Sequence, residues 1–208
     1  APNTVFELDN HKSFGVSFAD YNNDGFLDFF ICSRNLTDAN EHNVLVKNNG
    51  DGTFSDVTTS AGISLTNHLS FCSAFFDYNN DGLVDIFVAN DKPSTNNQLY
   101  QNNGDGTFTN VADVANTNQQ MDAMSTTIGD FDQDSFFDIY VTNTPNQGNL
   151  FLKNNTNATF SDITSNTSTS VNSFCWGAVF VDAENNGLLD LYVNSNYANV
   201  PNFPSAAF

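Results

Sequence analysis

The chain has few basic residues, with five lysines and arginines against 24 aspartates and glutamates among 208 residues. The formal net charge of −19 repels nucleic acid and anionic membranes, so neither is expected as a direct partner. No apolar run in the sequence approaches the roughly 20 residues that a membrane-spanning helix requires. We therefore expect no direct membrane insertion.

Motifs of the common catalytic classes are missing as well. The sequence contains no Gly-x-Ser-x-Gly, no phosphate-binding loop and no dinucleotide-binding fingerprint. Its three histidines, His11, His42 and His68, share no ligand spacing and lie beside no nucleophile motif. A carboxylate that chelates a metal is a poor general base, because its lone pairs are engaged. We expect that the protein is not an enzyme.

Cysteine is scarce and odd in number, with Cys32, Cys72 and Cys175 and no Cys-x-x-Cys. This spacing excludes a zinc site of the usual kind. A bridge between Cys32 and Cys72 and three buried free thiols are both compatible with the sequence. The disulfide state therefore stays open at this point.

What the chain does contain is one acidic loop in four copies. The copies span residues 20–28, 77–85, 130–138 and 182–190, and oxygen-bearing side chains recur at loop positions 1, 3, 5 and 9. A hard cation such as Ca²⁺ needs several oxygens that converge while the chain turns sharply. Glycine at position 6 permits that turn in three copies, and position 7 offers its backbone carbonyl. The sequence thus predicts up to four Ca²⁺ sites. Their predicted ligands are Asp20, Asn22, Asp24, Phe26, Asp28; Asp77, Asn79, Asp81, Leu83, Asp85; Asp130, Asp132, Asp134, Phe136, Asp138; and Asp182, Glu184, Asn186, Leu188, Asp190.

The four predicted sites are not equivalent. The first two loops carry the same Asp, Asn, Asp and Asp ligands, so they should bind alike. In the third loop Ser135 replaces the glycine, which makes the turn costly. In the fourth, Glu184 and Asn186 occupy positions 3 and 5, so we expect this site to be the weakest or empty.

A second motif alternates with the loops. It reads Asn-x-Leu followed by Asn-Asn-Gly-Asp-Gly-Thr-Phe in residues 43–54 and 97–108, and residues 149–160 are a third copy without glycines. Asn-Gly-Asp-Gly between apolar runs predicts a tight β-hairpin, in which Asp51 and Asp105 serve the turn.

The repeat predicts an all-β fold. Apolar residues alternate before and after each acidic loop, which indicates strands, whereas the Asn-rich connectors 91–97 and 142–148 read as loops. The loops start at 20, 77, 130 and 182, so the steps are 57, 53 and 52 residues. A four-stranded unit of about 50 residues is typical of a β-propeller blade. We expect one repeat domain over residues 1–208 with about four antiparallel blades. The last blade lacks a recognisable third strand. Either residues 4–8 join it and the tail 198–208 supplies a third strand, or a strand from a neighbouring copy fills the gap.

With the acidic loops and the Asn-x-Leu hairpins together, the chain resembles the FG-GAP/VCBS repeat proteins, whose blades are similar to those of the integrin α-subunit propeller. The resemblance covers nearly the whole chain. It implies that positions 1, 3, 5 and 9 of each loop are the side-chain ligands of calcium.

These features place the expected function outside the cell. Thirteen of the 24 acidic residues lie in the loops, and four Ca²⁺ would reduce the net charge to −11. Such loops suit an environment with millimolar calcium, as found in extracellular or secreted proteins. Ala1 in place of Met fits either removal of a signal peptide or a fragment. Candidate glycosylation acceptors are Asn35, Asn154, Asn157 and Asn166.

We expect a structural or adhesion module whose blades calcium staples together, and which self-associates or joins a larger assembly with another extracellular protein. The alternative is a calcium-stabilised lectin that binds carbohydrate between blades, with the aromatic residues around Trp176 as a sugar platform.

Overall fold

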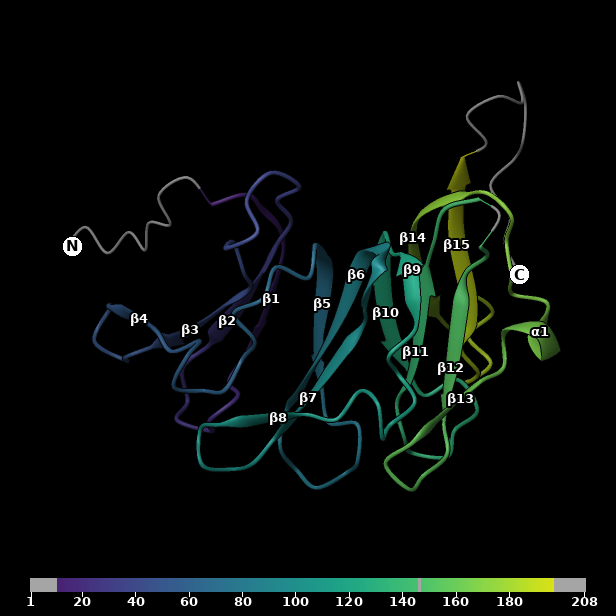
Figure 1. The fold of residues 1–208 in the computed structure, drawn as a ribbon. Helices are drawn as coiled ribbons and strands as arrows, with labels where there is room; N and C mark the ends of the chain where they lie inside the picture. The colour runs from purple at the N-terminus through teal and green to yellow at the C-terminus, as the bar shows by residue number, and fades with distance from the viewer. Residues whose placement is uncertain (1–10, 146, 197–208) are drawn as a thin grey trace.

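The computed structural model describes residues 11–145 and 147–196, and this part of the chain folds into four antiparallel β-sheets. The sheets follow one another along the chain and stand side by side in an open arc (Figure 1). The first contains β1 (Ser13–Ala19), β2 (Asp28–Ser33), β3 (Val44–Asn48) and β4 (Phe54–Asp56). The second contains β5 (Ser70–Phe76), β6 (Asp85–Asn96), β7 (Gln98–Asn102) and β8 (Phe108–Asn110), with β9 (Gln120–Asp122) attached to β6.

The third and fourth sheets complete the arc. The third contains β10 (Ser125–Gly129), β11 (Asp138–Thr142), β12 (Leu150–Asn154) and β13 (Phe160–Asp162). The fourth contains β14 (Phe174–Val181) and β15 (Asp190–Asn196). This is the β-propeller-type repeat of four-stranded antiparallel blades that the sequence predicts. We refer to the four sheets as blades one to four.

The strand order within each blade follows from short connections. An acidic loop joins the first strand to the second, and the hairpin motif joins the third to the fourth, so sequential strands pair in register. The hairpins need residues with positive φ, which Gly50 (77°) and Gly52 (88°) supply in blade one. In blade three Thr156 (62°) and Ala158 (63°) adopt the same conformation without glycine. The turn geometry therefore survives the loss of the glycines.

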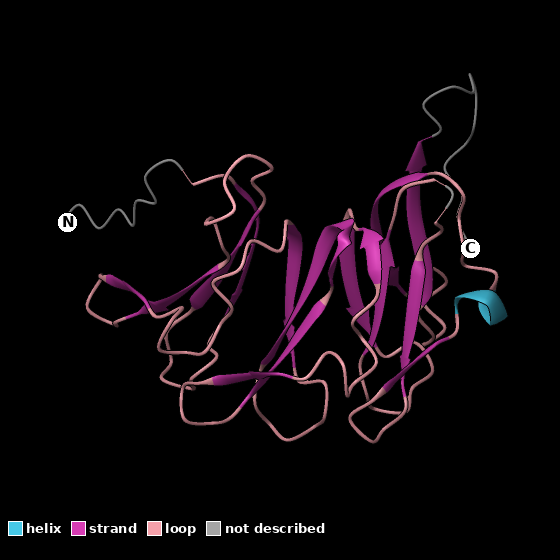
Figure 2. Cartoon of the chain, in the orientation of Figure 1, coloured by secondary structure: helices cyan, strands magenta, loops and turns pink. Residues whose placement is uncertain are grey.

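One connector differs from the sequence-based expectation. Residues 91–97, predicted as a loop, mostly extend β6, where Asp91 pairs with Asp122 and Asn96 with Gln120 in β9. The prediction was wrong because the Asn-rich composition conceals a partner strand 24 or more residues further along the chain. Figure 2 shows the resulting long strand in the middle of the arc.

Apolar residues between consecutive blades form the core. Three clusters lie between blades one and two, two and three, and three and four. Strand contacts repeat this order, since β1 contacts β5, β5 contacts β10, and β10 contacts β14. The fully buried side chains with the largest volumes include Tyr100, Tyr140, Phe30 and Phe87. Buried aromatic residues thus fill the space between sheets, as predicted, whereas others such as Phe14, Phe26 and Phe137 are exposed.

The completion of blade four falls partly outside the structure. The segments expected to close it, residues 4–8 and 198–208, lie outside the described residues. Within the described ranges the single helix is α1 (Thr164–Thr167), a four-residue turn. No helix in these ranges has the length and apolar character needed to cross a membrane.

Candidate metal centres

All four acidic loops share one backbone arrangement. The carboxylate at position 1 accepts hydrogen bonds from the backbone N–H groups of positions 5 and 6, and in the first loop Asp20 accepts them from Asp24 and Gly25. The corresponding distances in the four loops lie between 2.7 and 3.2 Å. The loops therefore curl around their first aspartate in the same way.

The carboxylate at position 9 connects the loop to the third strand of its blade. In the second loop, Asp85 Oδ2 accepts from the N–H of Tyr78 at 3.1 Å, and Oδ1 accepts from the N–H of Asn102 at 2.8 Å. Loops one and three repeat both contacts through Asp28 and Asp138. In loop four Asp190 keeps the bond within the loop, from Ala183 at 3.0 Å. Each site thus joins the first three strands of a complete blade.

Burial makes these position-9 carboxylates electrostatically strained. Asp28, Asp85 and Asp138 have no exposed surface. Burial raises the pKa of Asp85 to about 7, with a further rise from the negative charges of Asp81 and Asp77, against the lowering effect of the two N–H donors. Burial likewise raises the pKa of Asp138 to about 6 and that of Asp28 above its usual value. A bound cation would favour the ionised carboxylates, so this donor set fits calcium.

The third loop brings its carboxylates closest together. Ligand oxygens of Asp130, Asp132 and Asp138 all lie within 4.8 Å of one another, and this is the single such group among the described histidines, cysteines and acids. At position 5, Asp134 instead accepts from the N–H of Phe136 at 2.9 Å. Positions 5 and 7 are linked in this way in every loop. The contribution of the position-7 carbonyls stays a prediction.

The first two loops are less alike than their ligand residues suggest. In loop one, Lys47 Nζ lies 3.3 Å from Asp24 Oδ2. In loop three, Lys153 pairs with Asp132 and lies 3.8 Å from Asp134. Blade two has Gln101 at the matching position, where its amide oxygen accepts from the Tyr78 hydroxyl. The second loop therefore carries its three aspartates without a lysine beside them.

Backbone strain distinguishes the third loop. Position 6 has a positive φ in every copy, from Gly25 (87°), Gly82 (86°) and Gly187 (86°) to Ser135 (72°). A side chain raises the energy of this conformation, as expected from the sequence. The fourth loop keeps its glycine, and there Asn186 Nδ2 lies 3.4 Å from Glu184 Oε2.

An asparagine that sequence reasoning assigned only to the hairpin connects neighbouring blades. Asn102 Nδ2 donates to the carbonyl of Tyr21 in the preceding loop at 2.8 Å, while its Oδ1 accepts from Gly104 at 3.0 Å. Asn154 makes the matching bond to the carbonyl of Tyr78 at 2.7 Å. The recurrence of Asn-Asn in all three hairpins is the signal that identifies this residue.

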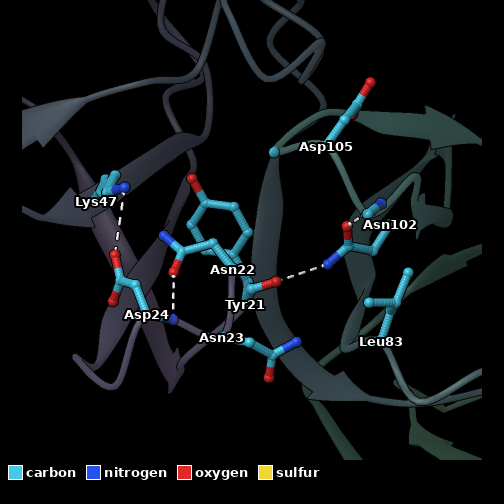
Figure 3. Close-up of a pocket in the computed structure, with 10 residues that line it drawn as sticks. Tyr21, Asn22, Asn23, Asp24, Lys47, Leu83, Asn102 and Asp105 are labelled. Atoms are coloured by element: carbon cyan, nitrogen blue, oxygen red, sulfur yellow. Dashed lines mark hydrogen bonds and ion pairs between the residues drawn. The ribbon is translucent and has the colours of Figure 1, made fainter.

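A cavity of about 380 Å³ opens where loop one meets blade two (Figure 3). Tyr21, Asn22 and Asp24 line one side, and Asn102 and Asp105 the other. Asn22 Nδ2 is buried there without a hydrogen-bond partner, while Asn22 Oδ1 accepts from Asp24 at 3.0 Å. Asp105 points away from the loop in Figure 3, and it accepts from Thr107 of its own turn, consistent with its predicted role.

The structure separates the candidate glycosylation acceptors into two groups. Asn35 is 6% exposed and Asn154 is fully buried, and both donate from the amide nitrogen that a glycan would occupy. These two predictions do not fit the folded chain, because a sequon carries no information on burial. Asn157 and Asn166 are exposed, so they remain candidates. Cys32, Cys72 and Cys175 are free thiols.

The repeat matches a known family profile, and the fold is similar to that of a solved structure. The profile of the FG-GAP-like repeat matches residues 20–88, 77–141 and 130–193, and each match begins at the first aspartate of a loop. A lectin of Agrocybe aegerita, described as recognising non-reducing terminal N-acetylglucosamine, has a similar structure, with a TM-score of 0.50 and 21% sequence identity. The likeness covers 89% of this chain and 47% of the lectin chain, so this chain spans about half the lectin's length. At this identity it shows the fold alone. No curated protein matches the chain.

Proposed function

The chain belongs to the FG-GAP-like repeat family, and from this premise we propose that it is a calcium-binding structural and adhesion module that acts outside the cell. The observation that carries the proposal is the repeated loop, which curls around a carboxylate at position 1 and, in blades one to three, buries another at position 9. In the third loop oxygens of both carboxylates lie within 4.8 Å of each other. In blades one to three the pKa of this buried carboxylate is raised. A divalent cation relieves the burial of negative charge, as the ligand chemistry of Ca²⁺ predicts.

Calcium in these loops would staple strands and blades together. Asp85 accepts a hydrogen bond from the backbone N–H of Asn102 at the end of β7, and the side chain of Asn102 donates one to the carbonyl of Tyr21 in blade one. Order in one loop is thus coupled to the position of the neighbouring blade. The loop carboxylates act as ligands in this proposal, so the module has no catalytic role.

Thermal unfolding with and without calcium tests the proposal. Binding to the native state alone stabilises it by about 2.7 kcal/mol per site at a hundredfold excess of calcium over Kd. For a chain of this size that corresponds to a rise in melting temperature of roughly 5–10 °C per occupied site. Equal magnesium serves as the control, since its smaller ion demands a tighter octahedron. A melting temperature that is the same with calcium and with excess chelator would exclude the proposal.

The second candidate function is that of a calcium-stabilised lectin. It is favoured by Phe174 and Trp176, whose rings stack with centroids 6.3 Å apart and 16° between planes, and Trp176 is 55% exposed. Flat, exposed rings are suited to the apolar face of a sugar. Trp176 is the single tryptophan in the chain, so its fluorescence reports on this position alone. Titration with N-acetylglucosamine should shift the emission if the candidate is right, and an unchanged spectrum at tens of millimolar sugar excludes it at this position.

A further inference from the structure

The three interfaces between blades use the same positions of the repeat. The residue two before each loop's first aspartate packs against the preceding blade, as Phe75, Ile128 and Phe180 do. The residue ten after that aspartate is buried toward the following blade, and Phe30, Phe87 and Tyr140 have no exposed surface. Each blade thus has one apolar face for its predecessor and one for its successor.

At the two ends of the arc the residues at these two positions, Phe18 and Tyr192, are exposed, and so are their apolar neighbours. In blade one, Phe18 is 59% exposed and Val16 is 55% exposed, on the face that would meet a preceding blade. In blade four, Tyr192 is 39%, Val181 41% and Val179 47% exposed, on the face that would meet a following blade. We call these sets the leading face and the trailing face. Figure 1 shows blades one and four at opposite ends of the arc, so one molecule's two faces do not cover each other.

The internal interfaces specify how a neighbour packs. Between blades one and two, Ser17 Oγ lies 2.7 Å from Ser73 Oγ, which pairs the third residue before one loop with the fourth residue before the next. Between blades two and three, Phe76, one residue before its loop, and Ile128, two residues before the next loop, belong to one core cluster. The matching pair between blades three and four is Gly129 and Phe180, where a Cβ on the glycine would come within 2.7 Å of the ring. Continued past blade four, the same pairing of positions places Val179 against Val16 and Val181 against Phe18, and the second pair follows Phe76 and Ile128, because a valine does not fit the glycine contact. Both pairs are apolar, which suits a buried contact.

We propose that a second copy of this chain covers the leading face with its trailing face, in a head-to-tail contact that continues the stacking of blades. The two faces differ and complement each other, so the contact is heterologous and two copies can satisfy both pairs of faces in one ring. The inference rests on the proposed function in one respect. The net charge of each chain falls from −19 to −11 when four calcium ions are bound. Repulsion between two copies is then weaker, so calcium should strengthen the contact.

The test measures the mass of the native particle by light scattering after gel filtration, at low micromolar protein with calcium. Wild type should be a dimer or a larger oligomer. Phe18→Asp and Val181→Arg should each be monomeric, and a mixture of the two variants should regain a dimer, because each retains the face that the other lacks. Val114→Asp is the control, since Val114 is 73% exposed and belongs to neither face, and it should leave the mass unchanged.

Several outcomes overturn the inference. These are a monomeric wild type, an oligomer that survives both substitutions, and an oligomer lost through one face only, which would indicate a symmetric contact between identical faces. Thermal unfolding of each variant shows whether it is folded. Phe18→Ser replaces Phe18→Asp if the charged variant does not fold. If the melting temperature does not change with chelator but the oligomer depends on the two faces, the calcium proposal alone is rejected. If the melting temperature depends on calcium but the protein is strictly monomeric, the contact alone is rejected.

Discussion

The buried carboxylate of Asp85 predicts an unusual dependence of stability on pH when calcium is absent. Burial raises its pKa from 3.8 to about 7 in the folded chain. A raised pKa means that the contribution of this group to stability is fully present below the unfolded-state pKa and is lost as pH rises through about 7. The calcium-free protein should therefore lose stability between about pH 4 and pH 7, where most carboxylates do the opposite.

The substitution Asp85→Asn removes this titration, because asparagine is neutral at every pH. It also loses one hydrogen bond, since the asparagine Nδ2 cannot accept from the N–H of Tyr78 or Asn102, and this loss does not depend on pH. The pKa displacement corresponds to at most roughly 4 kcal/mol at pH 8. In metal-free buffer the variant should be less stable than wild type near pH 4, and the difference in stability should shift in favour of the variant as pH rises to 8. In calcium the variant should be less stable than wild type at every pH, since it lacks one ionised ligand of the second loop.

Melting curves of dialysed, metal-free protein from pH 4 to pH 8 measure this difference in stability between variant and wild type. The matched control is Asp105→Asn in the same blade, where hydrogen bonds from Thr107 lower the pKa of the exposed carboxyl. The stability of that variant relative to wild type should not increase as pH rises. A difference in stability between Asp85→Asn and wild type that stays constant from pH 4 to pH 8 would refute the reasoning.

Three further predictions follow from single contacts. Lys47→Gln copies the residue of blade two and removes the ammonium 3.3 Å from Asp24, so it should tighten calcium binding in loop one, measured by competition with a chelating dye; weaker binding would contradict it. Asn154→Ala removes the bond to the Tyr78 carbonyl and should lower the free energy of unfolding by about 1–3 kcal/mol in urea titrations. Asn48→Ala removes an amide whose Nδ2 donates only to the Leu27 carbonyl of its own blade, at 3.3 Å, so it should lower the free energy of unfolding less, and equal losses would argue against the link between blades. Ser135→Gly relieves a φ of 72° and should raise the free energy of unfolding by roughly 0.5–1 kcal/mol, and a loss would show that the serine is not strained.

Much of the fold could be predicted because the repeat makes local signals agree. Alternating residues such as Phe29 and Ile31 lie in strands as expected, and the acidic loops recur with one geometry. The pairing of β6 with β9 could not be predicted, because it depends on a tertiary contact that leaves no pattern in the Asn-rich segment.

Side-chain contacts were the harder part of the site. Lys47 lies in the third strand, and only the folded hairpin brings it beside Asp24. Asn154 forms a sequon in the sequence, yet it is buried as a link between blades. In both cases the residue type was visible, while its partner depended on how two strands or two blades come together.

The central claim, that the acidic loops bind calcium, is tested most directly by calorimetric titration of metal-free protein with calcium. The account predicts saturable binding at three or four sites per chain, with the fourth loop the weakest. Asp85→Ala should remove one site and leave the heat of the weakest site unchanged. Absence of binding at millimolar calcium, or the same number of sites in Asp85→Ala as in wild type, would contradict the account.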